Sequence, residues 1–292
     1  MNSESRPPLV SVVMSVLNGA STVGAAVRSI QLQTLQNWEL IVIDNGSADE
    51  SGSVVSGFND ARIRLIREEP SAGLAVRLNQ GVALSRGEFI ARMDADDVCF
   101  PDRLERQVAR LQQDPQLDLI GCGAVVFTNG GELIGKLPLR LTHEEIIAQP
   151  SRGFPLPHPT WCGRAVWFRN NPYDPRSAAA EDQDLLLRTH RTSKFGSLET
   201  VFLGYRQDQL DLRKLLPGRR AYVGSLWRYA RQSGQFLYPI QGIAMHALKG
   251  TADIATICLG MNRLAQRYRL EPVSPSTRRQ WRDLQRLTLE RE

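Results

Sequence analysis

The sequence predicts an α/β protein with a mostly parallel sheet. Over roughly the first 130 residues, short apolar runs rich in β-branched residues alternate with segments whose apolar residues recur every three or four positions. The first pattern is typical of strands buried on both faces, and the second is typical of helices. Their alternation favours strand–helix–strand units, and ligands bind such sheets beyond the carboxyl ends of the strands.

The elements can be assigned in order from the N-terminus. We expect strands at residues 9–17, 38–44, 62–68, 88–93 and 117–127. We expect a helix capped by Ser21, with Val23, Val27, Ile30 and Thr34 on one face, and further helices at 74–85, from Pro101 onward and at 180–191. The Pro- and Gly-rich stretch 150–180 indicates ordered loops, because its Trp and Phe side chains require burial.

A change of charge and of pattern divides the chain near residue 210. Residues 211–292 hold 15 Lys and Arg against 6 Asp and Glu, whereas the first 210 residues are mildly acidic, and the whole chain carries a net charge of +5. After residue 210 the pattern is helical only, and the apolar residues of 254–268 fall on one helix face. We predict an α/β domain at 1–210 and a basic helical region at 211–292, which either packs on that domain or attaches to an anionic membrane.

The spacing of the cysteines and the sequence of the N-terminus indicate the cellular compartment of the protein. Cys99, Cys122, Cys162 and Cys258 have neither paired nor zinc-like spacing, which indicates buried apolar residues in a reducing compartment. The N-terminus is polar and lacks an apolar signal core, and no run reaches the roughly 18–20 apolar residues that span a bilayer. We expect a cytoplasmic protein, soluble or peripheral on the inner face of the membrane.

Three carboxylates, Asp94, Asp96 and Asp97, crowd the segment that follows the fourth expected strand. Like charges this close are costly without a cation, and their spacing lets two of them face one hard metal ion. The alternative is a solvated acidic turn, in which Asp97 or Asp102 caps the next helix. A second acidic strand end at Asp44 favours the metal or ligand site, because both strand ends can face one crevice.

Residue spacing alone does not decide the interpretation of three other features. Asp44 either belongs to a plain turn or accepts hydrogen bonds from a nucleobase or ribose. Glu181, Asp182 and Asp184 begin a helix, where the dipole favours carboxylates, or one of them is a general base. His158 lies in the Pro-rich loop, and a lone histidine there is typical of a structural hydrogen bond.

A resemblance to a known family spans about Val10 to Arg206. The four stretches "VSVVMSVLNGASTVGAAVRSIQLQTLQNWELIVIDNGSADES", "LNQGVALSRGEFIARMDADDVCFPDRLERQ", "HPTWCGRAVW" and "YDPRSAAAEDQDLLLR" resemble, in this order, the inverting family 2 glycosyltransferases of the GT-A fold. The resemblance implies a Rossmann-like, mixed and mostly parallel sheet flanked by helices, here with an α-helical C-terminal extension. It also implies Mg²⁺ or Mn²⁺ as cofactor.

The resemblance gives roles to individual residues of this chain. The nucleotide-binding residues it implies are Ser15, Leu17, Asn18, Asp44, Asn79, Asp94 and Ala95. Ala95 is small enough to let the backbone approach the nucleotide. Asp96 matches the direct metal ligand, with Asp94 beside it and near the ribose. Asp182 matches the catalytic base, and His158 and Glu181 match positions on the acceptor side.

These roles predict a metal-dependent glycosyltransferase of the hexosyltransferase type. It would move a sugar from a nucleotide-sugar donor, expected to be a UDP-sugar, to a hydroxyl of a glycan or lipid-linked acceptor in bacterial-type surface polysaccharide or glycoconjugate synthesis. No nucleic-acid recognition module is visible, so no nucleic-acid partner is expected.

Two alternatives come from other classes. One is a metal-dependent phosphatase or phosphotransferase, in which the first Asp of "DADDV" attacks phosphorus. That chemistry needs a downstream Lys, and Lys136 and Lys194 are poorly placed for it. The other is an inactive, transferase-like partner subunit, against which the intact Asp94, Asp96 and Asp182 argue.

Overall fold

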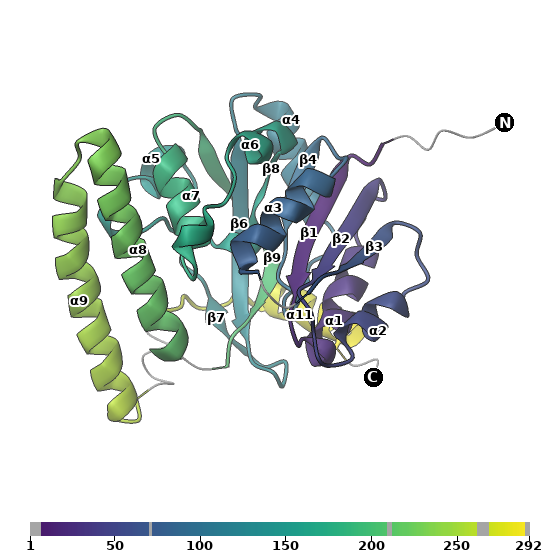
Figure 1. Ribbon diagram of the computed structural model, residues 1–292. Helices are drawn as coiled ribbons and strands as arrows, with labels where there is room; N and C mark the ends of the chain where they lie inside the picture. The colour runs from purple at the N-terminus through teal and green to yellow at the C-terminus, as the bar shows by residue number, and fades with distance from the viewer. Residues whose placement is uncertain (1–6, 70–71, 209–211, 262–268, 290–292) are drawn as a thin grey trace.

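The computed structural model describes residues 7–69, 72–208, 212–261 and 269–289, which form a nine-stranded sheet covered by helices on both faces (Figure 1). The strands run in the order β3-β2-β1-β4-β8-β6-β9-β5, and β7 pairs with β6. Their bounds are β1 Val10–Val16, β2 Trp38–Asp44, β3 Ile63–Arg67, β4 Phe89–Arg92, β5 Val98–Cys99, β6 Leu119–Phe127, β7 Leu133–Lys136, β8 Cys162–Arg164 and β9 Phe195–Arg206.

The pairing confirms the predicted α/β fold and shows where the sheet becomes mixed. β1 pairs in parallel with β2 and β4, and β2 pairs in parallel with β3. β8 is antiparallel to both β4 and β6, and β5 is antiparallel to β9. The parallel half carries the alternating strand–helix pattern of the sequence, because each parallel connection requires a crossover.

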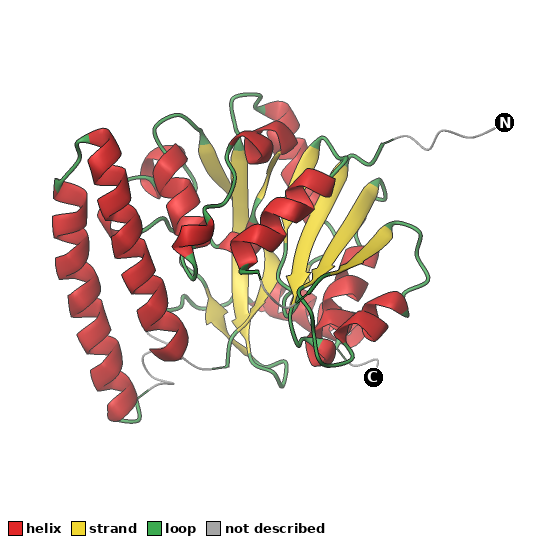
Figure 2. Cartoon of the chain, viewed as in Figure 1, coloured by secondary structure: helices red, strands yellow, loops and turns green. Residues whose placement is uncertain are grey.

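Helices cover the two faces of the sheet in separate layers (Figure 2). Their bounds are α1 Ala20–Gln31, α2 Ser51–Ser56, α3 Leu74–Leu84, α4 Arg103–Gln113, α5 His143–Ile146, α6 Ala165–Asn170, α7 Glu181–Thr189, α8 Leu212–Ser233, α9 Leu237–Cys258 and α11 Pro275–Thr288. In β1, Val10, Val12, Met14 and Val16 join one core cluster with α1, α4 and α11, whereas Val13 joins the other with α3, α6 and α7. Burial on both faces explains the continuous apolar run of this strand.

The C-terminal region divides into two parts. α8 packs against α7 through the buried Tyr222 and Leu226, and α9 packs against α8. α11 instead returns to the α/β core, where the Trp281 ring lies 4.6 Å from the Phe127 ring and its indole N–H donates to the Gly131 carbonyl at 3.0 Å. The predicted division at residue 210 therefore stays a prediction, since the last helix shares the core of the α/β domain. Among the described residues, no helix combines the length and apolar character needed to cross a membrane.

The expected cap of the first helix was wrong. α1 begins at Ala20, its N-cap is Gly19, and Ser21 lies inside the first turn without a capping bond. The loop after β2 satisfies the helix start instead, because the Gly19 N–H donates to Ser51 Oγ and the Ala20 N–H donates to Asp49 Oδ2. Thr34, expected on a helix face, lies beyond the end of α1.

Two further expectations need correction. The helix expected at 254–268 is interrupted: residues 254–258 are the last turn of α9, which ends at Cys258 and is followed by Gly260 with φ +68°. Residues 262–268 lie outside the described residues. Cys258 is exposed, whereas the other three cysteines are buried as expected.

Candidate active site

The candidate active site lies where β1, β2 and β4 end. Val16 lies opposite Asp44 in the parallel pair β1–β2, and Val13 lies opposite Arg92 in the parallel pair β1–β4. Asp44 therefore ends its strand at the same edge of the sheet at which the chain enters the segment 94–97. The predicted convergence of two acidic strand ends at one edge is confirmed.

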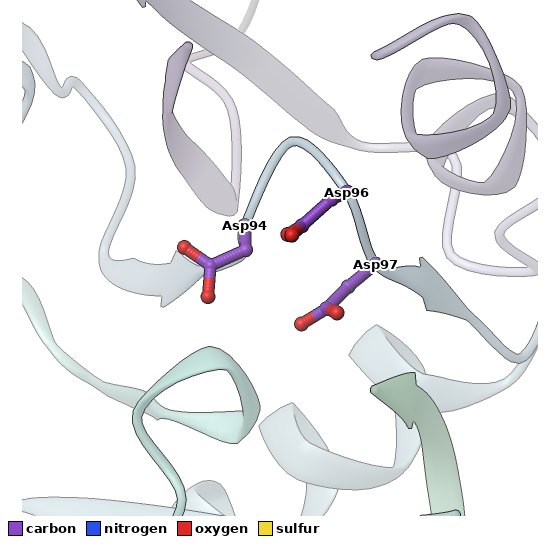
Figure 3. A group of neighbouring side chains, drawn as sticks. All are labelled: Asp94, Asp96 and Asp97. Atoms are coloured by element: carbon purple, nitrogen blue, oxygen red, sulfur yellow. The ribbon is translucent and has the colours of Figure 1, made fainter. Parts of the chain in front are cut away.

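Asp94, Asp96 and Asp97 form a group that we term the aspartate cluster. Their carboxylates point into one space, and one oxygen of each lies within 4.8 Å of the others (Figure 3). Asp97 is fully buried, and its Oδ1 accepts the backbone N–H of Arg206 at 2.9 Å. Desolvation, followed by the charges of Asp94 and Asp96, raises the pKa of Asp97 well above its usual value. Desolvation and the charge of Asp94 also raise the pKa of Asp96.

The donor set of the aspartate cluster fits a hard divalent cation. Asp97 Oδ2 has no hydrogen-bond partner among the described residues, which is unusual for a buried carboxylate oxygen. Mg²⁺ and similar cations take carboxylate oxygens as ligands. Asp97 caps no helix, and α4 has Asp102 at its N-cap without a side-chain bond. The structure thus adds Asp97 to the pair of carboxylates that the sequence indicated.

A buried cation, Arg92, lies beside the aspartate cluster and was not identified from the sequence. Its guanidinium forms an ion pair with Asp94, and the Arg92 side chain is only 5% exposed. The Nε and Nη1 atoms have no hydrogen-bond partner among the described residues. Unpartnered guanidinium N–H groups suit phosphate or hydroxyl oxygens, since Arg recognises phosphate through such donors. The sequence feature that could have identified Arg92 is its position as a single Arg in an otherwise apolar strand.

Hydrogen bonds connect the loops that follow β1 and β2, on the side of the site where a nucleotide is expected. The Asn18 N–H donates to Ser47 Oγ, and Asn18 Oδ1 accepts the Ala48 N–H, both at 2.9 Å. Asn18 has a φ of 51°, which Asn tolerates better than most residues. Asp44 Oδ1 accepts the Ser47 N–H at 2.9 Å, so the turn interpretation holds. Asp44 also borders a cavity of 450 Å³, which keeps the ligand interpretation open.

The remaining residues expected on the nucleotide side have varied surroundings. Ser15 is half-buried, Leu17 is 55% exposed at the end of β1, and Ala95 is buried within the aspartate loop. The Asn79 side chain donates to the Tyr173 carbonyl and accepts the Tyr173 N–H, both at 2.9 Å. Asn79 therefore fixes the Tyr173 segment, and its direct contact with a nucleotide stays a prediction.

His158 joins this network on the expected acceptor side. Its Nε2 shares a hydrogen bond of 2.8 Å with the Tyr173 hydroxyl, and its ring contacts the Trp161 ring edge-on at 4.6 Å. Desolvation, followed by the charge of Arg92, lowers the pKa of His158 well below its usual range. The imidazole is therefore neutral at pH 7 and acts as a hydrogen-bonding group rather than as a cation.

Asp184 is excluded as the free base among the three carboxylates that begin α7. It is buried, and its two oxygens form ion pairs with Arg188 at 2.8 Å and Arg228 at 3.2 Å. The pair with Arg188 lies within α7, and the pair with Arg228 connects α7 to α8. Asp184 is therefore a structural residue, as the helix-start interpretation of this segment would have it.

Asp182 and Glu181 have no such ion pairs among the described residues. Asp182 Oδ2 accepts one hydrogen bond of 3.2 Å, from the Gln183 side chain. Desolvation raises the pKa of Asp182 and of Glu181. A carboxylate with a raised pKa is a stronger base when it is ionised, so both meet the chemical requirement for proton abstraction.

Tyr173 connects the two halves of the site. Burial raises its pKa, and the charges of Asp182, Glu181 and Asp94 raise it further. Contacts connect the Tyr173 segment with Arg92 and with α7. The Tyr173 hydroxyl shares a hydrogen bond with His158, whose ring packs against Trp161, and the Trp161 carbonyl accepts the Arg92 N–H at 2.8 Å. On the other side, Arg188 of α7 donates to the Pro172 carbonyl at 2.7 Å.

Comparison with known proteins identifies the family. Residues 11–170 match the family described as Glycosyl transferase family 2. The match covers more than half of the chain, so the chain belongs to this family, and the resemblance carried by its motifs is confirmed. The family assignment gives no support to the phosphatase alternative.

Two relatives illustrate the range of the family. EpsE of Bacillus subtilis (strain 168), provisionally named a glycosyltransferase, is 34% identical over 187 residues, which are 62% of this chain and 66% of EpsE. WfgD of Escherichia coli, named UDP-Glc:alpha-D-GlcNAc-diphosphoundecaprenol beta-1,3-glucosyltransferase, is 31% identical over 141 residues, which are 48% of this chain and 55% of WfgD. The chain thus spans less than two thirds of the length of each of these relatives.

A solved structure shares the fold. TarS 1–349 of S. aureus in complex with UDP-GlcNAc has a TM-score of 0.61 and 14% identity, and the alignment covers 97% of this chain and 82% of that one. This likeness supports the GT-A-type architecture, a mixed sheet flanked by helices with helices at the C-terminus.

Proposed function

We propose that this protein is an inverting glycosyltransferase that moves a sugar from a UDP-sugar to a hydroxyl of a lipid-linked or glycan acceptor in surface polysaccharide or glycoconjugate synthesis. The observation that carries the proposal is the aspartate cluster, which lies at the strand ends beside Arg92 and has a buried carboxylate oxygen without a hydrogen-bond partner among the described residues. The UDP-GlcNAc complex of TarS and the activity named for WfgD support a uridine nucleotide and a lipid diphosphate acceptor.

The donor side is the aspartate cluster with Arg92. A divalent cation, Mg²⁺ or Mn²⁺, held by Asp94, Asp96 and Asp97 would offset the negative charge that grows on the leaving diphosphate. Arg92 holds Asp94 in place through its ion pair and offers two further N–H groups. Ala95 between the carboxylates leaves room for the nucleotide to approach the backbone.

The acceptor side is the start of α7. Asp182 removes a proton from the acceptor hydroxyl, and that oxygen attacks the anomeric carbon from the face opposite the diphosphate, so the configuration inverts. The Gln183 side chain fixes the orientation of Asp182 through its hydrogen bond. His158, neutral and bound to Tyr173, provides a wall that orients the acceptor without adding charge. Positioning of this kind supplies much of the acceleration in two-substrate reactions.

A donor screen followed by a release assay tests the proposal. Thermal shifts with Mn²⁺ and a panel of UDP-, GDP- and dTDP-sugars identify the donor, because a ligand that binds only the folded state raises the melting temperature. Nucleotide release is then measured with the wild type, Asp182→Asn and the matched control Asp283→Asn, whose carboxylate is exposed on α11. The wild type and Asp283→Asn should release nucleotide in the presence of acceptor, and Asp182→Asn should not. Unchanged turnover in Asp182→Asn would remove the base assignment.

We further propose that the outer side of α9 attaches the protein to an anionic membrane. Ten of the fifteen large apolar side chains exposed among the described residues lie between Leu212 and Met261. On α9 the outward residues recur at helical spacing: Leu237, Ile240, Ala244, Leu248, Thr251, Ala255 and Cys258. The charges of α9 are Lys249 and Asp253, and Asp253 is buried against Arg219. An uncharged outer stripe of about 33 Å is not typical of a helix that faces water.

The positive charge beside this surface favours an anionic membrane as its partner. Arg220 and Arg231 are exposed on α8, beside the exposed Trp227. Apolar side chains flanked by Arg and Lys are typical of interfacial helices, and anionic lipids attract such a surface. A second copy of the chain would instead bring like-charged arginines together.

Point variants of the full chain test the attachment. Removal of residues 211–292 is unsuitable, because it also takes Trp281 out of the core. We expect Ile240→Glu with Leu248→Glu to abolish co-sedimentation with phosphatidylglycerol vesicles, while Val166→Glu, an exposed apolar position on α6, leaves it unchanged. Equal sedimentation of all variants, or a salt-insensitive dimer that dissociates in the double variant, would contradict the membrane assignment.

A further inference from the structure

A second cavity lies on the acceptor side, between the catalytic core and α9. Its volume is 470 Å³, which is the size of a small-molecule site. Its walls come from four parts of the chain: the segment after β7, α5 and the loop after it, the start of α7, and α9. The apolar part includes Ile146, Phe154 and Pro155, and the charged part includes Arg140, Arg152 and Lys249.

The three cations of this cavity are not neutralised by direct ion pairs. Within the described residues, none of Arg140, Arg152 and Lys249 forms an ion pair. Arg140 donates to the neighbouring Leu139 carbonyl at 3.1 Å, and Arg152 contacts the sulfur of Met245 at 3.9 Å. Desolvation, followed by the charges of Arg219, Arg152 and Arg269, lowers the pKa of Lys249. Like charges in one place repel unless an anion joins them.

The one acidic residue in the cavity wall, Glu145, offsets only one of the three positive charges. The Glu145 carboxylate accepts the backbone N–H groups of Leu141 and Thr142, at 2.9 and 3.2 Å. The Thr142 bond belongs to the capping box of α5, and both bonds hold Glu145 at the helix start. With three cations against one carboxylate, the cavity wall keeps a net positive charge that favours an anionic ligand.

Gln183 forms a wall shared by this cavity and the proposed base. Its Nε2 lies 3.2 Å from Asp182 Oδ2 and donates to it, and its Oε1 accepts the Phe154 N–H at 2.7 Å. Gly153, with φ +97°, permits this approach, since a Cβ there would lie 2.8 Å from Gln183 Oε1. One side chain, Gln183, therefore separates the proposed base from the cavity.

We infer that this cavity binds the phosphate or diphosphate group of the acceptor, which sharpens and rests on the proposed function. The acceptor is then a phosphate-linked sugar, with its hydroxyl at Asp182 and its phosphate between Arg152 and Lys249. The donor diphosphate is assigned elsewhere, at the aspartate cluster. Lys249 belongs to α9, whose outer side carries the proposed membrane surface, so a lipid attached to that phosphate has apolar side chains nearby. Arg and Lys are the side chains that recognise phosphate.

Calorimetric titration of the full chain with farnesyl diphosphate in EDTA tests this inference. Without metal, the aspartate cluster repels an anion, so binding reports on the cationic cavity. We expect Arg152→Gln and Lys249→Gln each to weaken binding about tenfold, as the loss of a charged hydrogen bond does, and the double variant to weaken it further. Arg282→Gln, on the exposed face of α11, removes the same charge elsewhere and should bind within about twofold of the wild type.

Three comparison ligands separate the sources of phosphate. Farnesol should not bind, which shows that the diphosphate is required. Phosphatidylglycerol and inorganic pyrophosphate should bind more weakly than farnesyl diphosphate. Equal binding of phosphatidylglycerol, with the same sensitivity to Arg152→Gln, would make the cavity a lipid-headgroup site and overturn the acceptor assignment, as would equal binding of pyrophosphate.

The outcome is distinguishable from failure of the proposed function. An active transferase whose farnesyl diphosphate binding is the same in the wild type and in the Arg152→Gln, Lys249→Gln double variant refutes the cavity assignment alone. A chain that transfers no sugar from any donor in the panel refutes the proposed function, whatever the cavity binds.

Discussion

Two carboxylates two residues apart in α7, Asp182 and Asp184, are predicted to give opposite phenotypes when each is changed to Asn. Asp182→Asn keeps the shape of the side chain and one hydrogen bond to Gln183, but it removes the basic oxygen. Loss of a general base costs about 10²–10⁴-fold in turnover. Donor binding should persist, because Asp182 lies outside the aspartate cluster.

The stability of Asp182→Asn follows from the sign of its pKa shift. Desolvation raises the pKa of Asp182 above its ordinary value of 3.8. The folded state then binds more protons than the unfolded state between 3.8 and the raised pKa, so stability falls as pH rises through that window. At neutral pH the wild type has already lost this stability. Asp182→Asn has no charge to desolvate, and it should be at least as stable as the wild type.

Asp184→Asn should instead lose stability. Asp184 is 2% exposed, and it pairs with Arg188 and Arg228, whose side chains are each 30% exposed. Breaking a buried pair costs up to about 5 kcal/mol, and the partial exposure of both arginines reduces the cost to about 2–3 kcal/mol. Because the Arg228 pair connects α7 to α8, the loss should appear in the global unfolding transition.

Urea denaturation and a nucleotide release assay on both variants separate the two roles. The expected pattern is an inactive, stable Asp182→Asn and a destabilised Asp184→Asn that retains turnover below its unfolding transition. The reverse pattern, with turnover lost in Asp184→Asn and kept in Asp182→Asn, would refute the assignment of the base and the structural reasoning that supports it.

Four further outcomes follow from the site and the core. Turnover should fall as pH drops through the raised pKa of Asp182, so the acid limb of the pH–rate profile lies above 3.8 and disappears in Asp182→Asn, whose residual rate is flat there. Arg92→Met should lower turnover about a hundredfold, as loss of one electrostatic stabiliser does, which steady-state kinetics measures. Addition of Mn²⁺ should raise the melting temperature of the wild type, and EDTA should reverse the rise; Asp97→Asn should reduce it, and an equal rise in both would exclude Asp97 as a ligand. Trp281→Ala should cost about 3–5 kcal/mol in urea denaturation, whereas Trp227→Ala, 38% exposed, should cost little.

The parallel half of the fold could be predicted because its signals are local. Residues such as Val10–Val16 are apolar on both faces of the strand, and the helix after each strand repeats every three or four positions. β8 and β9 were not predicted. β8 has only three residues, and β9 carries exposed positions in its middle, at Glu199 and Thr200, so neither gives a clear period. Long-range pairing to β6 decides their structure instead.

The sequence predicted which types of residue form the site, but it did not predict the contacts that these residues make. The sequence indicated Asp94 and Asp96, because carboxylates after an apolar strand need a cation. It could not show the surroundings of Asp97. One oxygen of Asp97 accepts the N–H of Arg206, more than one hundred positions later, and the other oxygen has no partner among the described residues. Asp182 and Asp184 are equivalent on spacing, and only the arginine partners of Asp184 distinguish them.

The C-terminal region shows why charge alone was insufficient to assign its role. An excess of Arg and Lys indicated one basic region, yet its parts serve different surroundings. Arg219 and Arg269 compensate the buried Asp253, so they stabilise the helical hairpin rather than contact a partner. Arg152, from the catalytic core, and Lys249, from α9, line one cavity and form no ion pair among the described residues. The positive charge therefore has several surroundings: part is paired inside the fold, part is exposed beside the proposed membrane surface, and part lines the cavity next to the proposed base.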